Sequence, residues 1–367
     1  MKNAVRNTLG VILSVALLAW ALHNVEFSSV VEHLREANPW LFALAVVLGT
    51  SIFFVRAFRW RIILDPVAYH LPFGPLWRAT AIGFGINNVT PRVGEIARAY
   101  ALTRETSRVS FSASFASLAV DRVFDALSIL LLMLVAMFDP AFPSNRLVAG
   151  QPIGSWLVSF IIVLSLAMVA LYLIVLFPNF MIGLYEALAR RVAPRFEARG
   201  REMLLSFASG LGVLRHPGRF ASVLAWALIH WLLNALAYWV AFKAVGITAP
   251  FTAALLLQGL VGIGVALPSA PGFFGVFEYI GQQGLGIYGV DAARATSWAI
   301  GYHILTFIPI TVIGIYYFVR LGLHFKDLRK TEADSGAVAT ASARGPGSSA
   351  APEAPASKIA MAPEERA

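Results

Sequence analysis

The apolar run of residues 76–86 ends in a polar break, because five of the nine residues from Asn87 to Glu95 are polar or charged. A second break, at residues 266–278, contains two prolines and two glycines and again ends in a glutamate, Glu278. Hydrocarbon satisfies neither a free backbone group nor an unpaired charge, so such backbone must face protein or a wet cavity. Two hydrophobic segments interrupted in this way are typical of the central site of a transporter.

The composition is that of a polytopic membrane protein. Of the 367 residues, 58% are hydrophobic and only 13% are charged, whereas soluble domains contain about 25% charged residues. The absence of cysteine excludes disulfides, thiolate catalysis and a cysteine metal site. The formal charge of +9 lies in short loops beside apolar runs, which favours contact with anionic lipid headgroups and not with nucleic acid.

We expect an all-α polytopic membrane protein with about eight hydrophobic segments. A helix needs roughly 20 apolar residues to cross the hydrocarbon layer. The clear candidates are residues 8–22, 40–58, 115–138, 156–177, 220–245 and 297–319, and two shorter or broken runs lie at residues 76–90 and 251–268. The first run follows Lys2 and Arg6 as in a signal peptide, but no small-residue cleavage site follows, so we expect it to be retained.

The charges of the loops orient these segments. Three glutamates against Arg35 give the first loop a charge of −2, whereas the end of the second span and residues 178–219 are basic. The positive-inside rule then places both termini in the cytoplasm. With this orientation the two broken segments are most simply re-entrant hairpins that enter from opposite faces. Full crossings by all eight segments are the alternative.

The sequence predicts one membrane domain followed by a tail. Residues 1–330 form the membrane domain, and residues 178–219 are its cytoplasmic loop, with amphipathic helices expected at residues 180–188 and 203–214. Residues 331–367 are dominated by Ala, Ser, Pro and Gly and contain no aromatic residue. Such a segment cannot bury enough apolar surface to fold, so we expect a disordered cytoplasmic tail.

Three charged residues, Asp121, Arg122 and Asp125, lie inside one of the apolar runs. The two aspartates are four residues apart and share a helix face, and Arg122 can neutralise one of them. A charge at mid-bilayer costs roughly 2.5–3.5 kcal/mol on insertion scales, so these groups must be paired or wet. They form either a structural ion pair or the lining of a cavity, and Arg92 or Arg98 is the expected partner.

Each break ends in a glutamate that allows two interpretations. Glu95 and Glu278 follow a Pro/Gly turn, where a helix dipole stabilises a negative charge, so each is either a helix cap or a group that meets a substrate or a proton. Arg92 can bind a phosphate with its two-pronged guanidinium. Arg56 and Arg59 either anchor the second span at the inner face or gather anionic headgroups.

Three further polar residues lie on apolar segments: His230, Asn234 and His303. Each is interpreted as an interhelical hydrogen-bonding group in preference to a proton relay. A His-x-x-x-Asn spacing with no carboxylate nearby is a weak metal signal, and we expect no metal and no cofactor.

These residues fall into motifs that occur in a fixed order. They are Arg56-x-x-Arg59-Trp60, Asn88-x-x-Pro91-Arg92-x-Gly94-Glu95-x-x-Arg98, Asp121-Arg122-x-x-Asp125 and Pro268-x-x-Pro271-Gly272-x-x-Gly275-x-x-Glu278. Over residues 5–325 the chain resembles the flippase-like membrane domain of the lysylphosphatidylglycerol synthase/flippase proteins and their stand-alone relatives. The resemblance implies an eight-segment membrane domain that handles phospholipids or polyprenyl- or glycolipids.

The resemblance also implies which residues contact the substrate. They are Arg56, Arg59, Asn88, Pro91, Arg92, Glu95, Arg98, Asp121, Arg122, Asp125, Pro271, Gly272, Gly275 and Glu278. Many relatives carry Glu where this chain has Asp121, which shortens the carboxylate. The aminoacyl-transfer domain of the bifunctional members is not expected here, so this chain is not expected to make lysyl-lipids.

The leading hypothesis is therefore a lipid translocase of the inner (plasma) membrane that is not an enzyme. It would move an anionic phospholipid, an aminoacyl-lipid or a polyprenyl- or glycolipid by alternating access, and ATP would not drive it directly because no Gly-x4-Gly-Lys-Ser/Thr pattern occurs. The alternatives are a membrane enzyme such as a polyprenyl-phosphate glycosyltransferase, or an accessory subunit of a lipid-modifying enzyme. The expected partners are membrane lipids and a separate lipid-modifying enzyme.

Overall fold

The computed structural model describes residues 2–23, 25–90, 93–145, 147–148, 150–152, 177–192, 216–265 and 269–328, with ten isolated positions between 155 and 201. Two expected site residues, Pro91 and Arg92, lie outside the described residues. So do the helix expected at residues 203–214, the tail at 331–367 and most of the run expected to span the membrane at 156–177.

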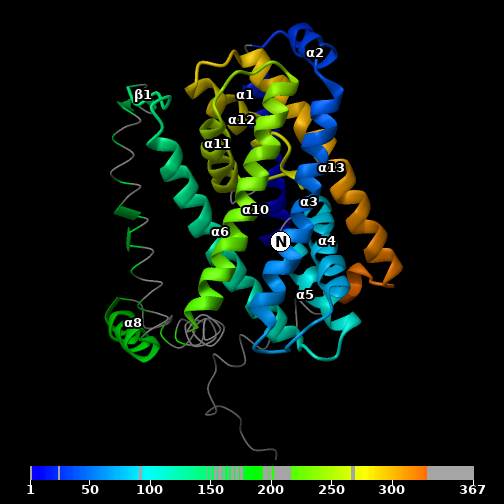
Figure 1. Ribbon diagram of the computed structural model, residues 1–367, viewed down its shortest axis with the longest axis vertical. Helices are drawn as coiled ribbons and strands as arrows, with labels where there is room; N and C mark the ends of the chain where they lie inside the picture. The colour runs from blue at the N-terminus through cyan, green and yellow to red at the C-terminus, as the bar shows by residue number, and fades with distance from the viewer. Residues whose placement is uncertain are drawn as a thin grey trace, which may run out of the picture.

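Helices dominate the described residues (Figure 1). They are α1 (Lys2–His23), α2 (Phe27–Arg35), α3 (Pro39–Leu64), α4 (Phe73–Val89), α5 (Gly94–Glu105), α6 (Phe111–Met137), α8 (Pro178–Val192), α10 (Pro217–Ala244), α11 (Phe251–Gly264), the 3-10 turn η3 (Pro271–Phe273), α12 (Val276–Ile287) and α13 (Ala292–Arg320). Two antiparallel two-residue strands, β1 (Leu147–Val148) and β2 (Gln151–Pro152), are the exception to the predicted all-α structure.

Three of the described helices, α3, α10 and α13, are long and apolar enough to cross a membrane, and they coincide with three of the predicted spans. A fourth span is formed if α1 and α2, which bend by 84° between them, are counted together. The sequence missed α2. The predicted run at 115–138 lies, except for its last residue, in the 27-residue helix α6, and α8 contains the predicted helix at 180–188. The chain is a multi-pass membrane protein, and the count of eight segments stays a prediction.

The first broken segment folds as an antiparallel hairpin of α4 and α5. At its open end Arg78 of α4 pairs with Glu105 of α5. Farther along, the helices lie so close that a Cβ atom on Gly94 would meet the Gly83 carbonyl oxygen. The chain that follows returns to its starting point, because the Arg108 guanidinium donates to the Tyr69 carbonyl at 2.5 Å, in the loop before α4.

The second broken segment folds as an antiparallel hairpin of α11 and α12. A Cβ atom on Gly264, the last residue of α11, would meet Ile280 near the start of α12, and one on Gly284 would meet Leu257. The two open ends also meet, because Pro250 and Tyr288 line the same cavity. This hairpin likewise begins and ends at one end of the molecule.

The two hairpins are based at opposite ends of α3 (Figure 1). Before the first turn of α3, the Asn38 amide donates to the Ala244 carbonyl at 2.8 Å, just before the chain enters α11. After its last turn, α3 leads into the loop at 65–72, which holds Arg108. A helix of 26 residues is about 39 Å long, so the hairpins enter the molecule from opposite ends.

Both hairpin tips lie against one stretch of α13. From α4, Asn88 donates to the Thr311 hydroxyl at 2.8 Å. Gly85 contacts Gly314 so closely that a Cβ atom on Gly85 would lie 2.7 Å from the Gly314 Cα. From the other hairpin, the Gly272 carbonyl lies 2.8 Å from His303 Nε2. These contacts on α13 flank Pro309, a residue that removes a helix hydrogen bond.

An aromatic core fixes α13 against α10 and α12. The ring of Trp298 lies 5.1 Å from Phe242 and 5.3 Å from Tyr238 of α10, and 5.7 Å from Phe277 of α12. Trp298 is fully buried. Aromatic pairs of this geometry contribute about 0.5–1.5 kcal/mol beyond the area that they bury, so this end of α13 is held rigidly while its middle contacts the tips.

We predict that Gly314→Ala destabilises the protein, because its Cβ atom would lie 2.5 Å from the Ala81 carbonyl oxygen and force α4 and α13 apart. Overpacking of this kind costs roughly 1–3 kcal/mol. The matched control is Gly218→Ala in α10, where a Cβ atom meets nothing within 4 Å. Thermal unfolding in detergent measures both variants, and equal melting temperatures would contradict the close crossing.

Candidate functional site

A buried cluster of charges joins α3 to α6. The Arg56 guanidinium donates to Asp125 at 2.6 Å and to Asp121 at 3.4 Å, and Arg59 lies 2.5 Å from Asp121 and 2.8 Å from Asp125. All four side chains are at most 5% exposed. Because removal of one partner would leave a buried charge uncompensated, the four groups form one structural unit.

The α4–α5 hairpin reaches this cluster through Arg98 of α5. Its guanidinium donates to Asp121 at 3.2 Å and lies over the ring of Trp60, 4.1 Å from the ring centre. Arg98 is 2% exposed, and its Nε and Nη2 atoms have no hydrogen-bond partner among the described residues. The sequence predicted Arg98 as a partner for the aspartates, and the structure confirms this contact.

The cluster reaches the surface at Arg122 and Glu95. These two residues form an ion pair between α6 and the first turn of α5, and the Arg122 side chain is half exposed. Arg122 also lies 3.6 Å from Asp125, as its spacing predicted. Glu95 is therefore paired with an arginine in addition to its place at a helix N-terminus.

Counted over the described residues, the cluster contains more positive than negative charge. Its guanidinium groups belong to Arg56, Arg59, Arg98 and Arg122, and its carboxylates belong to Asp121, Asp125 and Glu95. The four cations exceed the three anions by one. Among the residues that the structure describes, Arg56, Arg59 and Arg98 also have buried N–H groups without hydrogen-bond partners. An anionic group that entered the cluster would meet both an uncompensated charge and free donors.

The helix α10 closes the other side of the cluster. The Trp231 indole donates to Asp125 at 3.0 Å, and His230 lies 3.5 Å from Arg56. On the same face, Asn234 donates to Gln258 of α11 at 3.2 Å. The prediction that His230, Asn234 and His303 bond between helices is confirmed for all three.

The tip of the α11–α12 hairpin holds a second buried polar group. Glu278 accepts from the Gly275 amide at 2.6 Å, so it caps α12, which is one of the two interpretations that the sequence allowed. Its other oxygen lies 2.6 Å from His303 Nδ1. Glu278 is 2% and His303 8% exposed. The sequence placed both residues on apolar segments but did not pair them.

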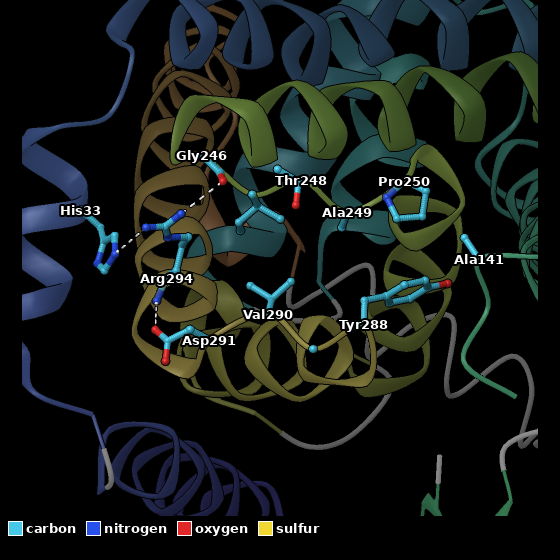
Figure 2. Close-up of a pocket in the computed structure, with 12 residues that line it drawn as sticks. His33, Ala141, Gly246, Thr248, Ala249, Pro250, Tyr288, Val290, Asp291 and Arg294 are labelled. Atoms are coloured by element: carbon cyan, nitrogen blue, oxygen red, sulfur yellow. Dashed lines mark hydrogen bonds between the residues drawn. The ribbon is translucent and has the colours of Figure 1, made fainter. Parts of the chain in front are cut away.

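A cavity of about 510 Å³ lies at the base of the α11–α12 hairpin (Figure 2). Arg294 of α13 points toward His33 of α2 and donates to the Gly246 carbonyl at 3.3 Å. Asp291 accepts from the Arg294 amide at 3.1 Å. Burial raises the pKa of the Tyr288 hydroxyl above its usual value. The sequence did not predict this cavity.

The structure therefore divides the predicted site residues between two groups. Arg56, Arg59, Glu95, Arg98, Asp121, Arg122 and Asp125 lie together in the cluster, whereas Pro271, Gly272, Gly275 and Glu278 lie at the second tip. Asn88 belongs to neither group and donates a hydrogen bond to Thr311 of α13. Trp60, Trp231 and His303 were not predicted to touch either group. Among the described residues, no group of three or more His, Asp or Glu side chains could hold a metal ion.

We predict that Asp125→Asn strongly destabilises the protein, because Arg56 and Arg59 would lose a shared counter-charge in a buried site. The expected cost is roughly 3–5 kcal/mol. The control is Glu36→Gln, an exposed carboxylate at the end of α2, for which we expect a change within about 0.5 kcal/mol. Chemical denaturation in detergent measures both variants. A cluster variant as stable as the control would contradict the structural role.

Comparison with known proteins finds one family model over most of the chain. It is described as the lysylphosphatidylglycerol synthase TM region and matches residues 7–314. A UPF0104 membrane protein of Methanothermobacter thermautotrophicus is 27% identical over 325 residues, which cover 79% of this chain and 87% of that protein. One from Pyrococcus horikoshii is 23% identical and covers 86% of this chain and 96% of its own length. A Haloferax volcanii protein named Glycosyltransferase AglD is 36% identical over 121 residues, 33% of this chain and 19% of that protein.

Proposed function

Because this chain belongs to the family of the lysylphosphatidylglycerol synthase TM region, we propose that it is a lipid translocase. Its substrate is an anionic phospholipid, an aminoacyl-lipid or a polyprenyl- or glycolipid. The headgroup passes through the protein while the acyl chains stay in the bilayer.

One observation carries this proposal: two antiparallel hairpins enter from opposite ends, and their tips contact α13 on either side of Pro309. Broken helices with opposite orientations that meet near the midplane are the architecture of alternating-access transporters. In the proposed mechanism the hairpins are re-entrant, and each in turn withdraws its tip from α13. A site between the tips then opens to one face at a time.

The charge of the buried cluster favours an anionic headgroup. A phosphate bound beside Arg98 would compensate the excess positive charge and accept hydrogen bonds from its free donors. The exposed edge at Arg122 and Glu95 provides the entry to this cluster. Arg92, which precedes Glu95 by three residues in the sequence, would help to capture the headgroup.

The charges at the base of the first hairpin support an orientation. The base of the α4–α5 hairpin carries Arg78, Arg104 and Arg108, which the positive-inside rule assigns to the cytoplasm. The proposed location is the inner (plasma) membrane with both termini inside. Membrane lipids are then the direct partners, and a separate enzyme would supply any modified lipid.

The partial similarity to a protein named as a glycosyltransferase favours a second candidate, an enzyme that acts on a polyprenyl-phosphate sugar. A general base must be free to take a proton. The cluster carboxylates Asp121, Asp125 and Glu95 are instead held by arginines. The arrangement thus supports binding and movement better than catalysis. Release of sugar from a polyprenyl-phosphate sugar by the purified protein would favour the enzyme.

Transport of fluorescent anionic lipid in proteoliposomes tests the proposal. We predict that Glu95→Gln and Glu278→Gln abolish translocation while the melting temperature stays near that of the parent. Arg92→Ala is expected to do the same, and Arg92→Lys to restore only part of the rate, because an ammonium lacks the bidentate geometry of a guanidinium. Glu36→Gln, on the surface of α2, is the matched control with parental transport.

Two results would count against this assignment. One is parental translocation by well-folded Glu95→Gln and Arg92→Ala proteins. The other is that the parent protein translocates none of the three lipid classes.

A further inference from the structure

The contacts of His303 restrict how many protons the second tip can hold. Its Nδ1 atom lies 2.6 Å from a Glu278 carboxyl oxygen, and its Nε2 atom lies 2.8 Å from the Gly272 carbonyl oxygen. A carbonyl oxygen only accepts, so Nε2 must carry a hydrogen. The second Glu278 oxygen is occupied by the Gly275 amide. One further proton must then lie between Nδ1 and the carboxyl group.

That proton has two possible positions. It can sit on Nδ1, which gives an imidazolium beside a carboxylate, or on Glu278, which gives a neutral imidazole beside a carboxylic acid. In both cases the pair holds the same number of protons and keeps every hydrogen bond. The pair therefore binds one proton as a unit.

Loss of this proton would break the arrangement. The lone pairs of Nδ1 and of the carboxylate would face each other at 2.6 Å, and an anion would remain in a site that is 2% exposed. A buried unpaired charge is far less stable than a hydrated one. The deprotonated pair must separate and admit water, which also breaks the hydrogen bond from His303 to the Gly272 carbonyl.

The backbone conformation of the second tip depends on this hydrogen bond to His303. Its backbone is in the left-handed region at Gly272 (φ 71°), Phe273 (φ 62°) and Gly275 (φ 84°). Such a conformation is unfavourable for Phe273, which is not a glycine, and it persists only where neighbours impose it. The imidazole is one such neighbour, and its ring also stacks on Phe274 with centroids 4.5 Å apart.

Among the described residues, the other titratable groups near the pair are phenols, including that of Tyr279, which follows Glu278 in α12. The phenols of Tyr238 on α10 and Tyr302 on α13 pack against Phe277, the neighbour of Glu278. The helix α1 presents Ser14, whose backbone contacts Gly275. Among the described residues, neither Glu278 nor His303 forms an ion pair with any third group. Within the described residues, no neighbouring charge therefore masks a change of protonation in this pair.

We infer that Glu278 and His303 form a proton-binding site that locks the α11–α12 tip onto α13, and that exchange of this proton with water couples translocation to the proton gradient. Only the coupling to translocation rests on the proposed function. When the proton leaves, it passes to the water that enters at the tip. When a proton binds, the pair re-forms and the tip closes.

Thiol labelling of the tip tests the lock, because the chain contains no cysteine. Ala270→Cys places a thiol beside Pro271. It leaves intact the hydrogen bond of 2.7 Å that the backbone amide of residue 270 donates to the Ser14 hydroxyl. Asn145→Cys, in an exposed loop, corrects for the pH dependence of thiol reactivity itself. Labelling of the purified protein in detergent is followed from pH 5 to pH 9.

We expect the corrected labelling rate at position 270 to rise with pH along a one-proton curve, by at least about tenfold, a change that corresponds to about 1.4 kcal/mol in the opening equilibrium. Adding Glu278→Gln should hold the rate at its low-pH value throughout, because the amide donates to Nδ1 and still accepts from Gly275. Adding His303→Ala should hold it high throughout. A corrected rate that does not change with pH in the parent, or that still changes in the Glu278→Gln protein, would overturn the inference.

The coupling is measured separately in proteoliposomes. The labelling experiment needs no transport, so pH-dependent labelling without lipid translocation would refute the proposed function and support the proton site. We expect the parent translocation rate to change when a pH gradient is imposed. Translocation that is equal with and without the gradient would overturn the coupling.

Discussion

The contact of two opposed hairpin tips with one stretch of α13 is the constraint on which the rest of the structure depends. Asn88 and Gly85 bind beyond Pro309, and Gly272 binds before it. A proline leaves one backbone carbonyl of its helix without an amide partner. The helix α13 therefore bends most easily in this part. A shift there changes the support of both tips at once, which is the physical condition for opening one and closing the other.

The two hairpins are held in different ways. The first is tied to the cluster through Arg98 and through the pair of Glu95 with Arg122. The second is held at its tip by hydrogen bonds to His303. The guanidinium groups that hold the first hairpin are not deprotonated in a protein. The imidazole that holds the second hairpin can lose a proton. The first hairpin is therefore suited to respond to an anionic headgroup, and the second to respond to a proton.

The sequence predicted the local features of this design. Hydropathy located α3, α10 and α13, and the Pro/Gly breaks located both tips, because each depends on neighbours in the chain. Helical spacing placed Asp121 and Asp125 on one face, where they both meet the same arginines. The re-entrant placement of the hairpins in a membrane, inferred from loop charges, stays a prediction.

The partners across helices were harder to predict. Arg56 and Asp121 are 65 residues apart, and no periodicity states that α3 packs against α6. The pairing of Glu278 with His303 and the cavity beside Arg294 depend in the same way on which helices are neighbours. The sequence signal for this pair was a histidine in an apolar segment and a carboxylate in a broken segment. A single sequence contains many possible pairs of this kind, so it did not identify these two as partners.

Cross-linking of the first tip to α13 tests the central claim most directly. Asn88→Cys and Thr311→Cys, introduced together, replace two side chains that are joined by a hydrogen bond, and a short cleavable thiol cross-linker then fixes the tip. A matched cross-link between Arg78→Cys and Glu105→Cys closes only the base of the same hairpin. If the tip must leave α13, the first cross-link stops lipid translocation, cleavage restores it, and the second cross-link has little effect. Undiminished translocation by protein fully cross-linked between positions 88 and 311 would contradict the account.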